Sequence, residues 1–286
     1  MAVYKRGYTR YQGALTGRLA RLFVLPRFAW RRLLDQRLVV ILLVAATFWP
    51  LLCAGFIYLS NHAELLLGFD EDMYQFLKID SRFFVIFMNA QSVFAILLSA
   101  FVGPSLIAPD LANGALPLYF SRPISRPEYV VARLLVLLGV LSVVTWVPGV
   151  LLFFMQSAMA GWSWFAANFQ IGAGVFFGFL LWILLVSLVA MASSAYVRWR
   201  IVAGALVLGV FFVLAGAAEL TNAVLRVEWA AAFNPGRAMN QIWCSMLGAD
   251  PIPGPDSTVC FIAMSIMAAL LLLVLNRKLR PVEVVS

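Results

Sequence analysis

The chain has 286 residues and a formal net charge of +8; 63% of its residues are hydrophobic and only 12% are charged. Soluble domains are about 45–50% apolar and about 25% charged, so this composition excludes an ordinary soluble domain. Apolar segments divide the whole sequence and leave no stretch long enough for a separate globular domain. The composition therefore predicts an all-α, polytopic protein whose apolar helices lie in a lipid bilayer.

Residues 1–37 form a basic segment without the apolar core and cleavage site of a secretory signal. Its helical spacing gives one leucine stripe with arginines beside it, formed by Leu15, Leu19, Leu22, Arg18 and Arg21. Such a helix is typical of the membrane interface, and Pro26 is expected to break or kink it. Two interpretations stay open: a positively charged anchor, or an interfacial helix that also contacts a cytoplasmic partner.

Six apolar runs follow, and about 20 apolar residues suffice for a helix to cross a bilayer. The runs cover residues 38–59, 83–108, 134–155, 169–191, 201–218 and 259–275. The last two are short, so we expect their helices to extend further at each end. The predicted organisation is therefore a cytoplasmic segment (1–37), a six-span transmembrane domain (38–275) and a cytoplasmic tail (276–286).

Basic residues are distributed unequally between the two sides that six spans define. Seventeen of the 21 lie in the N-terminal segment, in the loops after spans two and four, or in the tail. The other four are Lys78, Arg82, Arg226 and Arg237. By the positive-inside rule, we expect both termini on the cytoplasmic side of the cell's inner membrane. The positive-inside rule explains where these basic residues lie, so the net charge of +8 does not indicate a nucleic-acid partner, and we expect none.

Sequence motifs of common enzymes are absent. There is no P-loop for nucleotide phosphates and no Gly-x-Ser-x-Gly elbow, and His62 is the only histidine. One histidine cannot supply a zinc site or a catalytic triad. We therefore expect no catalytic residues, no cofactor and no metal in this chain.

The predicted spans contain no Asp, Glu, Lys or Arg. Ion-coupled transporters place ionisable groups within the bilayer, so this composition disfavours ion coupling. If the protein transports a substrate, the energy is expected to enter from another subunit on the cytoplasmic side. Four amides near the spans could hydrogen-bond between helices or line a path: Asn89, Gln91, Gln156 and Gln170.

The longest external segment, residues 220–258, contains the turn signal Asn234-Pro235-Gly236 between apolar residues at helical spacing. We expect two short re-entrant or surface helices around this turn, dipping toward the outer leaflet before the last span. Cys244 and Cys260 lie on or near the external side, where a disulfide is permitted. The sequence leaves open whether they are bridged.

The segment between spans two and three, residues 103–135, reads GPSLIAPDLANGALPLYFSRPISRPEYVVARLL. Gly103-Pro104 is expected to break span two near its inner end. Asp110 is expected at the start of a short helix, where the helix dipole favours a carboxylate. We expect Asn113-Gly114 to end that turn and Glu128 to open the helix that becomes span three.

Prolines and arginines follow this turn and make a stiff basic corner, Ser121-Arg122-Pro123-Ile124-Ser125-Arg126-Pro127. Proline fixes the backbone, so the arginine side chains project from a defined position. A short rigid element just below the membrane could transmit force from a soluble partner.

The segment resembles the permease subunits of ATP-binding-cassette (ABC) transporters of the type-2, exporter-like class. In that family an acidic residue after span two precedes a Gly-Ala/Thr-Leu step and a Ser/Thr-x-Pro-Ile-Ser-Arg corner. Asp110, Gly114-Ala115-Leu116 and residues 121–126 match these places, whereas Pro109 and Pro117 depart from the pattern.

The resemblance implies an ATP-driven exporter in which two permease protomers, as a homodimer, bind two separate cytoplasmic ATPase subunits. It also implies that the segment following span two couples ATP hydrolysis to transport. The residues expected to do so are Asp110, Gly114, Arg122, Pro123, Ser125, Arg126 and Glu128. Two other functions stay open: a non-transporting scaffold or regulatory subunit that anchors the ATPase, and a membrane enzyme acting on lipid.

Overall fold

The computed structural model describes residues 18–62, 78–114, 126–197 and 199–278, and these ranges contain helices and connecting turns but no strand. Six segments within these ranges are long and apolar enough to cross a membrane. They are Arg37–Asn61, Ser81–Asp110, Pro127–Ala160, Trp162–Tyr196, Arg200–Leu225 and Ser257–Lys278. The prediction of an all-α protein with six spans is confirmed.

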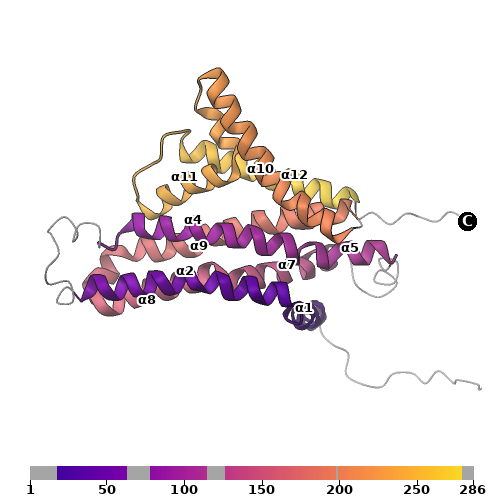
Figure 1. The fold of residues 1–286 in the computed structure, drawn as a ribbon, viewed down its shortest axis with the longest axis horizontal. Coiled ribbons are helices and arrows are strands. Elements are labelled where there is room, and N and C mark those ends of the chain that lie inside the picture. Colours follow the sequence, from indigo (N-terminus) through magenta and orange to yellow (C-terminus); the bar gives the residue numbers. More distant parts are fainter. Residues whose placement is uncertain (1–17, 63–77, 115–125, 198, 279–286) are drawn as a thin grey trace, which may run out of the picture.

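The spans form a bundle whose long axis is horizontal in Figure 1. Its helices are α2 (Arg37–Asn61), α4 (Ser81–Val102), α5 (Pro104–Ala112), α7 (Arg126–Val144), α8 (Trp146–Ala160), α9 (Trp162–Tyr196), α10 (Arg200–Leu225) and α12 (Ser257–Lys278). The helix α1 (Arg18–Leu34) is seen almost end-on and so crosses the direction of the spans, as predicted for an interfacial helix (Figure 1). We refer to the end of the bundle beside α1 as the α1 end, and to the end holding Asn61 and Ser81 as the opposite end.

The central helix is α9. Buried residues make up 72% of its most hydrophobic stretch, against 17% in α2 and α12. Close packing depends on Gly178, where an added Cβ would lie 2.8 Å from Cδ1 of Trp243. The indole of Trp243 also donates to the Gly178 carbonyl at 3.1 Å. The helices α4, α7, α8, α10 and α12 pack around α9, whereas α2 packs on α4 and α8, and the outer spans turn apolar side chains outward, as a lipid environment requires.

Two proline-containing spans are held together by one amide. Pro50 in α2 and Pro148 in α8 have no N–H, so the carbonyls four residues earlier, on Ala46 and Val144, lack their helical donors. The fully buried side chain of Gln91 on α4 donates one hydrogen bond to each, at 2.9 Å and 2.5 Å. Membrane helices tolerate proline where neighbouring groups satisfy such carbonyls. We call this arrangement the Gln91 clamp.

Several boundaries differ from the sequence prediction. Span three is two helices, because Pro148 interrupts the hydrogen-bond ladder and Thr145 leaves helical geometry (φ −112°, ψ −95°). Pro26, which was predicted to break or kink the N-terminal helix, does not break it, since α1 continues through it. Span four begins at Trp162, with non-helical geometry at Asn168, and α10 continues to Leu225.

The two short helices predicted before the last span are present. They are η2 (Trp229–Phe233) and α11 (Pro235–Leu247), and Asn234 between them caps α11 by accepting from the Gly236 amide at 3.0 Å. The apolar face of α11 is buried against α9, α12 and α4. Cys244 and Cys260 are free, buried thiols, so the structure contains no bridge between them.

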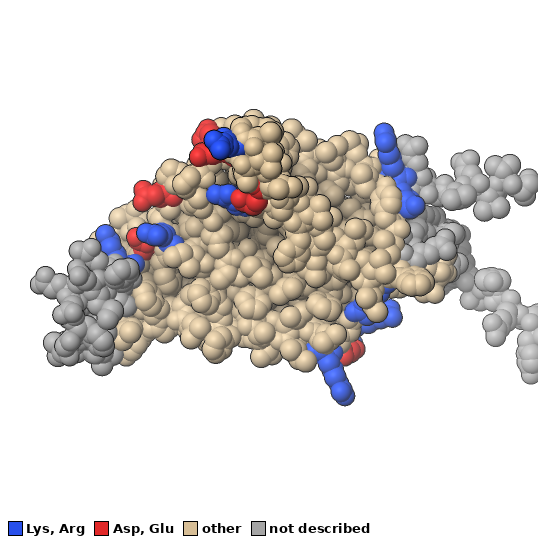
Figure 2. Space-filling model, turned by 45° about the horizontal axis from the view of Figure 1, so that its top comes forward, with Lys and Arg blue, Asp and Glu red and all other residues tan. Residues whose placement is uncertain are grey.

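The face of the described residues drawn in Figure 2 has a wide surface without charged side chains. This surface lies between mostly basic side chains near the α1 end and mixed basic and acidic side chains on the other side of the view. This distribution fits a chain whose middle lies in the hydrocarbon core of a bilayer. It also matches the asymmetry on which the predicted orientation rests.

Candidate functional site

The candidate site lies at the α1 end, where span two breaks. The helix α4 ends at Val102 and α5 begins at Pro104, as predicted for Gly103-Pro104. Gly103 is required there, because an added Cβ would lie 2.6 Å from Cβ of Ala190 on α9. The hydroxyl of Ser194 on α9 accepts from the Ala108 amide at 2.9 Å. These contacts hold α5 firmly against the central helix.

A compact charged cluster joins α5 to α7. The carboxylate of Asp110 accepts hydrogen bonds from the Arg133 guanidinium and, at 2.7 Å, from the Tyr129 hydroxyl. The Arg133 and Asp110 side chains are only 10% and 15% exposed. The guanidinium carbon of Arg133 also lies 5.2 Å from the Tyr129 ring centroid. We call these three residues the Asp110 cluster.

The placement of Asp110 corrects the sequence prediction. The residue was expected at the start of a short helix, but α5 spans Pro104–Ala112 and Asp110 lies in its last turn. The negative end of the helix dipole disfavours a carboxylate there. The cation of Arg133 offsets this, so Asp110 is an internal link between two helices and not a free helix cap.

The N-terminal helix is attached to the same region. The Trp30 indole of α1 donates to the Val136 carbonyl of α7 at 3.2 Å. Its ring lies against Gly139, where an added Cβ would come within 1.9 Å of Cζ2. Leu33, one turn further along α1, is 3% exposed. The two segments proposed from sequence as partner-contacting elements, α1 and the segment after span two, are therefore both joined to α7.

A polar cavity of about 220 Å³ lies between these helices. Its lining includes Arg32, Gln36, Asp110, Arg133 and Arg200. Arg200, at the start of α10, donates to the Gln36 side chain just before α2. Three arginines and one carboxylate give the cavity a positive potential, which suits acidic groups.

The remaining predicted site residues have different outcomes. Gly114 adopts a positive φ of 62° after α5, in agreement with the predicted turn, and Glu128 is in the first turn of α7. Arg126 is the first residue of α7. Its side chain, like the whole of Arg122, Pro123 and Ser125, lies outside the described residues.

Sequence reasoning missed Tyr129, Arg133 and Trp30 as members of this site. Arg133 follows Tyr129 by one helical turn, so the two share a helix face, and this spacing was a usable signal. Trp30 gave no local signal, because its partner Val136 is 106 positions away. Within the described ranges, no three His, Cys, Asp or Glu side chains gather as a metal site would require.

The fold and charge distribution define an all-helical, multi-pass membrane protein. No protein-family model and no curated protein matches its sequence.

Proposed function

We propose that this chain is the membrane-spanning permease subunit of an ATP-driven, exporter-like transporter. A separate ABC ATPase binds at the α1 end, which faces the cytoplasm, and a second copy of the chain completes the transmembrane unit. The observation that carries this proposal is that α1, α5, α7 and α9 are joined at that end. The likeness of residues 110–126 to type-2 permeases and the excess of basic residues support it.

The contacts provide a route for mechanical force. A displacement of α5 reaches α7 through Asp110 and Arg133, and it reaches α9 through Ala108 and Ser194. A displacement of α1 reaches α7 through Trp30. Rigid helices joined in this way move as bodies, which is the hinge or shear type of domain motion. The ATPase therefore does not need to enter the membrane to move the spans.

The test is purification of the affinity-tagged full chain from its native membranes in mild detergent. We expect an ATPase with a Walker motif to co-purify and to hydrolyse ATP faster with the chain in liposomes than alone. Replacing Arg122 and Arg126 together by Ala should reduce this stimulation, while Arg226→Ala, directly after α10, serves as the control.

Each other outcome has a defined meaning. Recovery of the chain without any ATPase contradicts the proposal. Binding of an ATPase without stimulation of hydrolysis supports the alternative of a scaffold or regulatory subunit. Equal stimulation by the Arg122/Arg126 variant and the parent shows that the basic corner is not the coupling element, and α1 then becomes the better candidate.

A further inference from the structure

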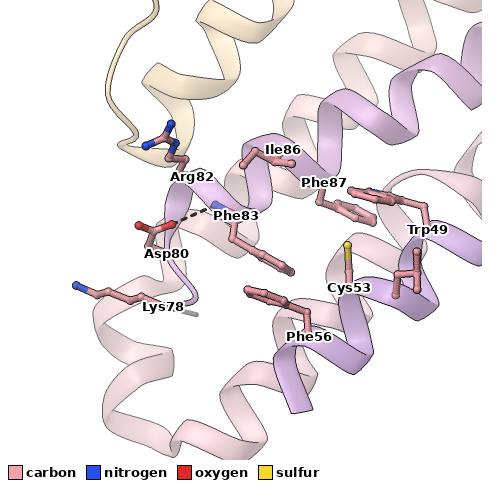
Figure 3. Close-up of a pocket in the computed structure, with 10 residues that line it drawn as sticks. Trp49, Cys53, Phe56, Lys78, Asp80, Arg82, Phe83, Ile86 and Phe87 are labelled. Atoms are coloured by element: carbon pink, nitrogen blue, oxygen red, sulfur yellow. Dashed lines mark hydrogen bonds between the residues drawn. The ribbon is translucent and has the colours of Figure 1, made fainter. Parts of the chain in front are cut away.

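A second cavity, of about 790 Å³, lies between α2 and α4 toward the opposite end of the bundle (Figure 3). This volume is within the range of small-molecule binding sites, about 300–1,000 Å³. The Asp110 cluster lies on α5 and α7 at the α1 end, so this cavity is separate from it. The proposed coupling of the ATPase to the spans does not involve the cavity.

The inner part of the cavity is apolar and aromatic. Figure 3 shows Phe56 and Phe83 facing each other from the two helices, with centroids 5.6 Å apart, and Cys53 pointing into the gap. Trp49 and Phe87 line the deeper portion. Such a surface suits hydrocarbon chains, which gain dispersion contacts with aromatic rings.

The rim of the cavity is charged, with Lys78, Asp80 and Arg82 grouped beside the start of α4 (Figure 3). The Asp80 carboxylate is engaged with its own helix, since it accepts from the Phe83 amide at 3.1 Å. Among the described residues of the rim, two cations against this one capping carboxylate give a net positive charge. Lys78 and Arg82 are two of the four basic residues that the sequence analysis places on the external side of the membrane.

The wall of the cavity continues into the lipid-facing surface. Leu52 on α2 and Ile86 on α4 both line it, and they are 50% and 53% exposed. Both belong to membrane-spanning helices, so their exposed surfaces face acyl chains. A lipid can therefore enter the cavity sideways, directly from the bilayer.

We propose that this cavity is a binding site for an anionic membrane lipid. Its acyl chain lies against Phe56, Phe83 and Phe87, and its phosphate lies at the rim, within reach of Lys78 and Arg82, whose side chains point away from the apolar interior in Figure 3. Arginine suits phosphate because its guanidinium donates two parallel hydrogen bonds, and lysine adds a point charge. The site is selective for anionic over zwitterionic headgroups, and binding does not depend on an ATPase partner.

The test uses the full chain in nanodiscs that contain phosphatidylglycerol with a photoreactive group in its acyl chain. Cross-linked peptides are mapped by mass spectrometry, and unlabelled phosphatidylglycerol or phosphatidylcholine is added as competitor. We expect cross-links at residues 49–56 and 83–87. Unlabelled phosphatidylglycerol should reduce the amount of cross-linking at these residues, and phosphatidylcholine should not. The double variant Lys78→Gln/Arg82→Gln should weaken labelling there about 25-fold, because each cation near a lipid headgroup changes affinity roughly fivefold and two are removed.

Two further variants make the test decisive. Arg226→Gln, which removes a cation on the same side but outside the cavity, should leave labelling unchanged. Ile86→Trp should fill the mouth and abolish labelling while the variant still folds, because this side chain is half exposed. Cross-links spread evenly over α2, α10 and α12, or labelling insensitive to headgroup charge and to both cavity variants, would overturn the proposal.

Discussion

The Gln91 clamp and the Asp110 cluster are both buried polar arrangements that join spans, yet they are built from different chemistry. The clamp is neutral, fully buried, and satisfies two carbonyls freed by prolines. The cluster contains a carboxylate and a guanidinium and lies near the α1 end, where both side chains keep slight exposure. The difference follows from depth in the membrane, because a charge far from the interface is much more costly than an amide.

The two arrangements also join different parts of the molecule. Gln91 holds α2, α4 and the α7–α8 break together inside the bundle, so it stabilises the packing of spans. The Asp110 cluster ties the short helix α5 to α7, so under the proposed function it carries a displacement at the α1 end to a span. We therefore expect mutations at the clamp to affect stability, and mutations at the cluster to affect both stability and coupling.

The largest effect is expected for Asp110→Ala. It leaves the Arg133 cation buried without this carboxylate, and breaking a buried ion pair by removing one partner costs about 3 kcal/mol or more. The free energy of unfolding in detergent micelles measures this loss. The double variant Asp110→Ala/Arg133→Met should recover most of it, since apolar residues of similar volume often replace a buried pair without loss. No recovery would mean that Asp110 stabilises the fold through Tyr129 instead.

The next largest effect is expected for Gln91→Leu, at about 1–3 kcal/mol, because hydrogen bonds inside membranes are each worth roughly 0.6–1.7 kcal/mol. The Oε1 atom of Gln91 is buried and accepts no hydrogen bond from the described residues. Replacing the amide by Leu removes this unsatisfied atom, so the net loss of stability is smaller. With Pro50→Ala, residue 50 regains an N–H for the Ala46 carbonyl, so Gln91→Leu should then cost less. A double-mutant cycle measures this coupling, and Gln170→Leu, an exposed amide, is the control. Strict additivity would disprove the clamp.

A smaller effect is expected for Gly139→Ala, which forces the Trp30 ring away from α7. Such overpacking typically costs about 1–3 kcal/mol, and we expect the low end because α1 lies at the edge of the bundle. Loosening of α1 should appear as faster proteolytic cleavage within Arg18–Leu34. Gly209→Ala is the matched control, since no atom lies within 4 Å of the added Cβ. Equal cleavage of both variants would show that Trp30 does not hold α1.

The smallest effect is expected at Asp256, outside the spans. Hydrogen bonds from the Thr258 hydroxyl and the Ser257 amide lower the pKa of this carboxyl below its usual value. Because the folded-state pKa is depressed, the stabilisation is present above the unfolded-state pKa and is lost as pH falls through the folded-state pKa. Asp256→Asn should therefore lower Tm slightly at neutral pH and lose its effect in acid. The exposed Asp250→Asn controls for removal of one negative charge.

Some features of this protein could be predicted from local sequence. Prolines and glycines act on their own backbone, which is why the break at Gly103-Pro104 and the turn at Asn234-Pro235-Gly236 were predicted correctly. The prediction that Asp110 lies at the start of a short helix was wrong, although it also rested on the local sequence. Asp110 lies in the last turn because α5 begins as early as Pro104, where Gly103 packs against Ala190 of α9, a contact invisible in the local sequence.

The sequence by itself determined the six spans and the charge asymmetry, because hydrophobic length and the positions of lysine and arginine respond to the bilayer whatever the helices contact. Only the tertiary structure decided which groups the buried polar side chains satisfy. Gln91 reaches carbonyls 45 and 53 positions away, and Trp30 reaches one 106 positions away. Such partners are set by how helices pack side by side, and the apolar surfaces that drive this packing leave many arrangements open until the whole bundle is assembled.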